Sequence, residues 1–321
     1  MNKKLRKILF TTLPIGIGVF IIVYFLSELT DKDKTAIINS FKTANYWWVA
    51  LSLFFGILSH LSRAYRWKFM IEPLGYKPKF PNLVMTVLVA YLVNLVLPRA
   101  GEVARATTFS KYENIPFDKA FGTIVAERVA DVIMLLSIIS LAFLLQGDLI
   151  KSYLFKDESN SYQSQIILAI FAMIAIVGYV ILKKSKHPFV LKVKSFFEGL
   201  LEGVKSILKM KSKWAFIFHT VFIWAMYVLM FYATTFALPE TTNLPFEAII
   251  VGFVVGGLSM ALTNGGLGVY PVAVAGALVL YGIEANPANA FGWIMWTAQT
   301  LMILLFGGLS FLMLPIYNKE K

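Results

Sequence analysis

The chain has 321 residues, of which 58% are hydrophobic and 15% are charged, and its mean hydropathy is +0.70. This composition excludes an ordinary soluble domain and is typical of a protein that crosses a membrane several times. It contains no cysteine, and its histidines (His60, His187 and His219) are far apart in the sequence, so we expect neither disulfides nor a metal site. The net charge of +12 is then assigned to one side of a membrane rather than to nucleic acid.

The first apolar stretch, residues 8–26, follows a basic start. No small-x-small cleavage site follows it, so a retained spanning helix is expected rather than a signal peptide. Residues 31–46 are polar and amphipathic, and Tyr46, Trp47 and Trp48 are typical of a lipid interface. Residues 1–46 are therefore predicted to form an N-terminal helix and an interfacial segment.

A second spanning helix is predicted over residues 47–70. Its last turns carry Arg63, Arg66, Trp67 and Lys68. The simplest interpretation is that these side chains snorkel to the membrane surface, and the second is that the arginines bind a lipid headgroup.

The next apolar run, residues 83–97, is too short to cross a bilayer. Its residues span about 22 Å at about 1.5 Å each, against a hydrocarbon core of about 30 Å. It leads into N-L-V-L-P-R-A-G-E-V-A-R at residues 94–105, where Pro98 ends the helix and Gly101 lets the chain turn back. The charged residues of the return are Arg99, Glu102, Arg105 and Lys111. Because bare charges are costly in lipid, we predict a re-entrant hairpin over residues 83–110.

A third spanning helix, residues 120–145, contains the sequence E-R-x-x-D at Glu127, Arg128 and Asp131. Glu127 and Asp131 are one turn apart and share a helix face, and Asp131 is predicted to lie near the middle of the bilayer. Residues 47–146 form a first repeat unit in this interpretation.

Residues 166–182 are predicted to be a fourth span. The segment 183–213 then carries nine lysines interleaved with apolar residues. This spacing favours an amphipathic helix on an anionic membrane surface, and a solvated cytoplasmic linker is the alternative.

The second half of the chain repeats the order of the first: a long apolar segment, a short interrupted segment and another long apolar segment. A fifth span is expected over residues 214–238 and a last one over 290–314. Between them, short arms at 248–262 and 269–281 flank N-G-G-L-G at residues 264–268. We predict a second hairpin over residues 248–282, within a second repeat unit at 214–315. The glycine amides either hold an anion or only form a turn.

With two hairpins the fold class is an all-α polytopic membrane protein with about six spans. Most of the 30 lysines and arginines then lie on the side that holds both termini, which identifies that side as cytoplasmic. The hairpins enter from opposite faces, which is the inverted-repeat plan of many transporters.

The charges on the first hairpin can pair with those on the third helix. Arg99 and Arg105 are placed to neutralise Glu127 and Asp131, and Arg128 to pair with Glu102. These pairs either lock the hairpin to the helix or leave an arginine to bind an anionic headgroup, since a guanidinium matches two phosphate oxygens. In a third interpretation the carboxylates carry protons during transport.

Four motifs resemble the lysylphosphatidylglycerol synthase transmembrane-region family. They are R-A-Y-R-W-K (63–68), N-L-V-L-P-R-A-G-E-V-A-R (94–105), A-E-R-V-A-D (126–131) and N-G-G-L-G (264–268). In the last motif this chain has Asn264 where the family has proline, and Tyr270 and Pro271 where a glutamate is usual. The candidate substrate-binding residues are Arg63, Arg66, Asn94, Arg99, Glu102, Arg105, Glu127, Arg128, Asp131, Asn264, Gly265, Gly266, Gly268 and Tyr270.

The resemblance implies translocation of an anionic, aminoacylated or sugar-linked lipid between leaflets. It implies no enzymatic activity and no cofactor, because the synthase members carry a separate catalytic domain. We expect the chain in a bacterial plasma membrane, with both termini in the cytoplasm as the distribution of basic residues indicates. Two other hypotheses stay open: a non-catalytic subunit of an envelope-building complex, and an intramembrane enzyme acting on a lipid headgroup. Self-association is left open as well.

Overall fold

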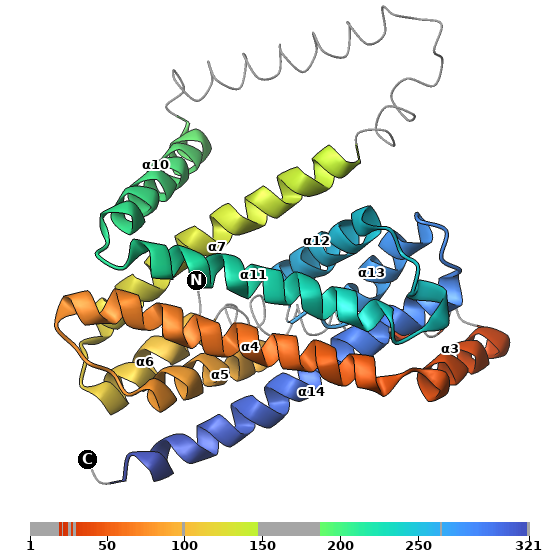
Figure 1. Cartoon of the computed structure of the whole chain (residues 1–321), viewed down its shortest axis with the longest axis horizontal. Helices are drawn as coiled ribbons and strands as arrows, with labels where there is room; N and C mark the ends of the chain where they lie inside the picture. The colour runs from red at the N-terminus through yellow and green to blue at the C-terminus, as the bar shows by residue number, and fades with distance from the viewer. Residues whose placement is uncertain are drawn as a thin grey trace, which may run out of the picture. The chain divides into compact units, whose positions relative to one another are not determined.

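A computed structural model describes residues 19, 20, 22–24, 27, 30–97, 100–146, 187–263 and 265–319. The chain divides into two compact units, residues 1–138 with 214–321 and residues 139–213. The described residues form α-helices and short 3-10 turns, as the composition predicts (Figure 1). The helices are α3 (Asp31–Thr43), α4 (Tyr46–Ile71), α5 (Phe80–Val96), α6 (Gly101–Glu113), α7 (Phe117–Leu145), α10 (Pro188–Lys209), α11 (Lys213–Thr235), α12 (Phe246–Leu262), α13 (Val269–Val279) and α14 (Ala285–Tyr317).

Helix lengths separate the long segments from the interrupted ones. Among the described residues, α7, α11 and α14 are long and apolar enough to cross a membrane, whereas α5, α12 and α13 are shorter apolar helices. The predicted third, fifth and last spans correspond to α7, α11 and α14, with ends shifted by a few residues. The predicted second span corresponds to α4, which has 26 residues but is not among the helices apolar enough to cross a membrane. The predicted first span lies for the most part outside the described residues, and the fourth lies wholly outside them.

The helices α5 and α6 form a hairpin whose arms lie side by side (Figure 1). At its open end, the backbone N–H of Lys79 and the side-chain amide of Asn82 donate to Glu113 Oε1 at 3.2 and 2.5 Å. The amides of Asn82 and Asn318 also bond each other, at 3.0 and 2.9 Å. The start of α5, the end of α6 and the end of α14 therefore share one end of this unit, which we call the Glu113 end.

The helices α12 and α13 enter from the opposite end. There the N–H of Asn45 donates to the carbonyl of Ala237 at 2.8 Å, and Asn286 donates to Asp33 at 3.0 Å. The helix α12 begins a few residues beyond Ala237, and α13 ends just before α14 begins, so both short arms open at what we call the Asp33 end.

The tips of the two interrupted segments meet inside the unit. Gly265, Gly266 and Gly268 turn the chain between α12 and α13 with φ of 58°, 77° and 72°, in the region that favours glycine. A Cβ on Gly265 would lie 2.9 Å from the side chain of Leu95, near the end of α5. The indole N–H of Trp296 donates to the Gly265 carbonyl at 2.8 Å and fixes the turn from α14.

The break between α5 and α6 depends on a side chain that acts as a cap. Asn94 Oδ1 accepts the N–H of Gly101 at 2.7 Å and so satisfies a donor at the start of α6. A Cβ on Gly101 would overlap the Ala90 carbonyl and the Asn94 amide, so only glycine fits there. Asn94, predicted as a substrate-binding residue, thus has a structural role at the break.

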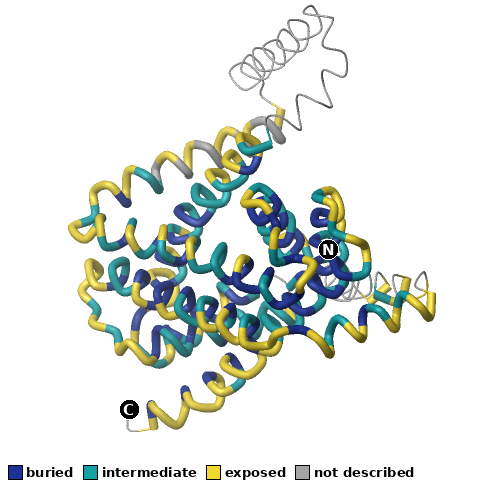
Figure 2. The backbone as a smooth tube through the Cα atoms, turned by 45° about the vertical axis from the view of Figure 1, so that its right-hand side comes forward, coloured by how far each residue is buried: buried dark blue, intermediate teal, exposed yellow. Residues whose placement is uncertain are grey.

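Burial follows the pattern of a helical membrane protein (Figure 2). Buried residues gather where the helices meet, and the C-terminal half of α14 is largely exposed. Its exposed apolar side chains include Leu304, Leu305, Phe311, Leu312 and Ile316. Such a surface is costly in water and suits contact with lipid tails.

The cap at the break provides a test of this packing. We expect Gly101→Ala to lower the free energy of unfolding by about 1–3 kcal/mol, because the methyl group forces α6 away from α5. The matched control is Gly122→Ala in α7, where nothing lies within 4 Å of the added methyl, and which should be neutral or slightly stabilising. Thermal unfolding in detergent micelles measures both variants, and equal effects would contradict the packing described.

Candidate anion site in a buried arginine cluster

Seven charged side chains from three helices meet inside the larger unit, and we call them the arginine cluster. They are Arg63 and Arg66 from α4, Glu102 and Arg105 from α6, and Glu127, Arg128 and Asp131 from α7. Five of them are buried: Arg66 and Glu127 are 0% exposed, Arg105 2%, Arg63 3% and Asp131 7%. Buried charges persist only when they are paired, so the geometry of the pairs decides the site.

Glu127 is the centre of the cluster. Its Oε1 accepts from Arg63 at 3.0 Å and from Arg66 at 2.8 Å, and its Oε2 accepts from Arg105 at 3.1 Å. One carboxylate therefore connects α4 and α6 to α7.

Asp131 lies one turn further along α7 and repeats the pattern. Its Oδ2 accepts from Arg63 at 2.6 Å and from Arg128 at 3.2 Å, and its Oδ1 accepts from Arg66 at 3.0 Å. Two arginines on one face of α4 thus match two acids on one face of α7. Asp131 lies midway between the ends of α7, which places the cluster at the middle of a helix long enough to span the membrane.

Neighbouring groups hold two of the arginines in position. Arg66 also donates to Thr220 of α11 at 2.9 Å. The guanidinium of Arg105 lies over the ring of Trp67, 3.8 Å from its centroid. The indole N–H of Trp67 in turn donates to Thr123 at 2.9 Å, so this cation–π contact has a fixed orientation.

The cluster carries more positive than negative charge, since four arginines face three acids. The outermost pair is the least buried: the side chains of Arg128 and Glu102 are 39% and 27% exposed, and their atoms Nη2 and Oε1 are 3.0 Å apart. Beside this pair lies a narrow cavity of about 10 Å³, about the space of one water molecule. Its lining is Arg63, Val87, Ala90, Tyr91, Asn94, Glu102, Arg105 and Arg128.

Donor capacity is left over in the cluster. Within the described residues, the buried Nε atoms of Arg63, Arg66, Arg105 and Arg128 have no hydrogen-bond partner. The excess positive charge, the unpaired Nε donors and the partly exposed Arg128 together make the cluster a candidate binding site for an anion.

The structure corrects one prediction for the cluster and confirms two. Arg63 and Arg66 were predicted to snorkel to the membrane surface, and this is wrong, because both are buried and paired with the acids of α7. The predicted pairs Arg105–Glu127 and Arg128–Glu102 are confirmed. Arg99 and Asn264 lie outside the described residues.

The glycine motif is separate from the cluster. The turn residues Gly265, Gly266 and Gly268 make none of the cluster's hydrogen bonds or ion pairs within the described chain. Tyr270 is 3% exposed and packs in the hydrophobic core instead. The turn is confirmed, and anion binding by its amides stays a prediction.

The sequence did not predict that aromatic residues lie next to the cluster. Tyr91 and Tyr227 bring their hydroxyls to 3.2 Å, and the ring of His60 lies 4.5 Å from that of Tyr91. The buried Thr220 was missed as well. Single polar residues within apolar helices carry no periodic signal. Only the one-turn spacing of Arg63 and Arg66 (i, i+3), which is close to that of Glu127 and Asp131 (i, i+4), could have indicated their pairing.

An all-α chain with a charged cluster halfway along a spanning helix defines a polytopic membrane protein with an internal polar site. The chain belongs to the family described as the lysylphosphatidylglycerol synthase TM region, which it matches over residues 12–307. This confirms the resemblance drawn from the motifs and makes the protein a multi-pass membrane protein.

Three curated relatives are archaeal. A UPF0104 membrane protein, MJ1595, of Methanocaldococcus jannaschii is 35% identical over 129 residues, or 39% of this chain and 37% of the relative. Glycosyltransferase AglD of Haloferax volcanii is 32% identical over 118 residues, 36% of this chain and 19% of the relative. A UPF0104 membrane protein of Methanothermobacter thermautotrophicus is 22% identical over 178 residues, which are 54% of this chain and 46% of the relative. Each match covers less than half of the relative's length.

Removing the central acid tests how the cluster is held together. Glu127→Gln leaves the buried Arg105 without its carboxylate partner and leaves Arg63 and Arg66 to share Asp131 alone, so we expect the free energy of unfolding to fall by about 3–5 kcal/mol. The control Glu102→Gln removes an acid from the more exposed pair and should cost about 1 kcal/mol or less. Chemical unfolding in detergent micelles compares them; equal losses would show that Glu127 is not the central acid.

Proposed function

We propose that this protein is a flippase-like transporter that moves an anionic lipid between membrane leaflets, with the arginine cluster as the site that holds the headgroup. The candidate lipids are an anionic phospholipid, an aminoacylated lipid and a lipid-linked sugar. The observation that carries the proposal is the excess positive charge of the cluster, which reaches the cavity at the partly exposed Arg128.

The exposed pair offers a route for an anion to enter. The pair of Arg128 and Glu102 is the least buried of the cluster, so Glu102 is the acid that a phosphate can replace with the least loss of buried contacts. Arg128 contacts Glu102 through Nη2 at 3.0 Å and Asp131 through Nη1 at 3.2 Å, so a phosphate that replaces Glu102 would bind at Nη2 while the Asp131 contact is kept. Because the cavity holds little more than a water molecule, entry of a headgroup requires the α5–α6 hairpin to move away from α7.

The proposed topology has about six spans and two re-entrant hairpins in an inverted repeat. Support comes from the hairpin α5–α6 opening at the Glu113 end and the α12–α13 segment opening at the Asp33 end, with their tips in contact. Half-length helices of opposite direction that meet inside the protein are the plan of many transporters. We place the Glu113 end and both termini in the cytoplasm because the basic loops gather there.

The lysine-rich helix α10 is proposed to lie on the anionic surface of the same side. Lys194, Lys205 and Lys209 are exposed on this helix, whereas Ile207 is buried. Such a helix gains about 1 kcal/mol for each basic residue near an anionic leaflet.

An enzymatic role has less support. Both acids of α7 accept hydrogen bonds from several arginines, which leaves neither free to act as a general acid or base. The glycosyltransferase name belongs to a relative of which only 19% is matched, so we propose no such activity for this chain.

Lipid movement can be measured in vesicles that contain the purified protein and a fluorescent anionic phospholipid. We expect Arg128→Gln to slow lipid movement by about tenfold to a hundredfold. The reason is that the headgroup loses a charged hydrogen bond while the lipid passes between leaflets, which raises the barrier. Arg128→Lys keeps the charge without the paired donors and should be intermediate. Arg99→Ala tests the predicted hairpin arginine in the same assay.

The control is Lys111→Gln, which removes an exposed positive charge outside the cluster and should leave the rate unchanged. Chemical modification of the lipid by the wild-type protein would support the intramembrane enzyme instead. Neither movement nor modification, in vesicles where the protein is folded, would support the accessory subunit.

The topology can be mapped with single cysteines, because the native chain has none. Lys77→Cys and Lys205→Cys should react with a membrane-impermeant thiol reagent from the cytoplasmic side, and Glu240→Cys from the other side. All three native residues are exposed, so accessibility depends on the side alone. Labelling of Lys77→Cys and Glu240→Cys from the same side would exclude the inverted arrangement.

A further inference from the structure

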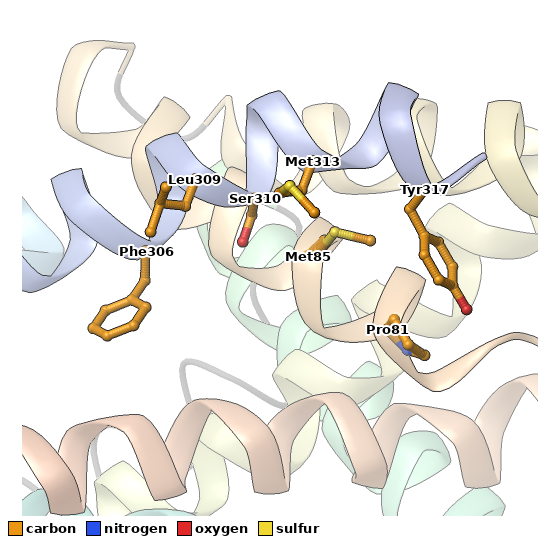
Figure 3. Close-up of a pocket in the computed structure, with 7 residues that line it drawn as sticks. All are labelled: Pro81, Met85, Phe306, Leu309, Ser310, Met313 and Tyr317. Carbon is orange, nitrogen blue, oxygen red and sulfur yellow. The ribbon is translucent and has the colours of Figure 1, made fainter. Parts of the chain in front are cut away.

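A groove between α5 and α14 forms a second candidate site (Figure 3). Its lining is mostly apolar, whereas the arginine cluster is charged. Its cavity volume is about 250 Å³. Pro81 and Met85 form one wall, and the other wall comes from α14. The α14 residues are Phe306, Leu309, Ser310, Met313 and Tyr317.

The groove is bounded at both ends. At the inner end α14 closes on α5, since a Cβ on Gly307 would lie 2.9 Å from the Leu88 carbonyl. At the outer end the paired amides of Asn82 and Asn318 join the two helices. Lys79 lies at this outer end, with its ammonium 5.5 Å from the centroid of the Tyr317 ring.

The length of the groove matches one leaflet. From Gly307 to Tyr317, α14 rises about 15 Å, which is half of a hydrocarbon core of about 30 Å. The outer end of the groove, which carries Lys79, is therefore at headgroup depth when the inner end at Gly307 is at the middle of the bilayer.

We propose that this groove holds one acyl chain of an anionic phospholipid, with its phosphate beside the ammonium of Lys79. The apolar walls, two of whose residues are the adaptable Met85 and Met313, fit a flexible chain. The nearby carboxylate of Glu113 is already engaged, since its Oε1 accepts from the Lys79 backbone and from Asn82. The proposal does not depend on whether the protein moves lipid.

Native mass spectrometry of the detergent-solubilised protein tests this, with phosphatidylglycerol and phosphatidylcholine of identical acyl chains as probes. The wild-type protein should retain one phosphatidylglycerol in preference to phosphatidylcholine by about fivefold, the effect of one basic residue near the headgroup. Lys79→Gln should abolish the preference. Ser310→Trp, which fills the groove, should reduce retention of both lipids by about tenfold.

The matched controls are Lys111→Gln, an exposed lysine elsewhere, and Leu312→Trp, on the exposed side of α14. Both should bind like the wild type. Equal retention by the wild type, Lys79→Gln and Ser310→Trp would overturn the proposal. So would loss of a homodimer in Ser310→Trp with lipid retention unchanged, because a second copy would then occupy the groove. Should Ser310→Trp fail to fold, the exposed Lys79→Gln variant still decides the question.

Discussion

The fold of the larger unit depends on two carboxylates that are shared by four guanidiniums. Glu127 and Asp131 accept hydrogen bonds from α4, α6 and α7 itself, at distances of 2.6–3.2 Å. Burying five charged groups is expensive, and only mutual pairing offsets that cost. The α5–α6 hairpin, which is too short to cross the membrane, is thereby attached to α7, which is long and apolar enough to cross it. Since the cluster retains one positive charge, an anion that enters it reduces the electrostatic cost of the fold itself.

The two interrupted segments each place a chain break inside the larger unit, where backbone groups need hydrogen-bond partners. A bare chain break inside a bilayer exposes backbone donors and acceptors, which is tolerated only where the protein satisfies them. At the first break Asn94 accepts the N–H of Gly101, and at the second the indole of Trp296 donates to Gly265. Each break thus has a side-chain partner, Asn94 from the adjoining arm α5 and Trp296 from α14, and the two tips approach each other at Leu95 and Gly265.

The sequence was sufficient for the helices and for part of the site. Apolar run length separated the short arms α5, α12 and α13 from the spans α7, α11 and α14, because lipid imposes a fixed length on any helix that crosses it. The pairs Arg105–Glu127 and Arg128–Glu102 followed from charges on two adjacent segments. Arg63 and Arg66 were misassigned because arginines beside Trp67 near a helix end look the same whether they face lipid headgroups or buried acids. Burial distinguishes the two cases, and burial arises from the packing of α6 and α7, which no local pattern encodes.

The helix α5 separates the two proposed sites and so constrains how they relate. Pro81 and Met85 are about 40° apart around the helix axis and line the groove, whereas Ala90, Tyr91 and Asn94 line the cavity on roughly the opposite face. A lipid whose phosphate is bound at Arg128 therefore cannot lay its own chain in the groove while α5 lies between them. The lipid of the groove and the lipid of the cluster are two different molecules, or one molecule at two successive positions.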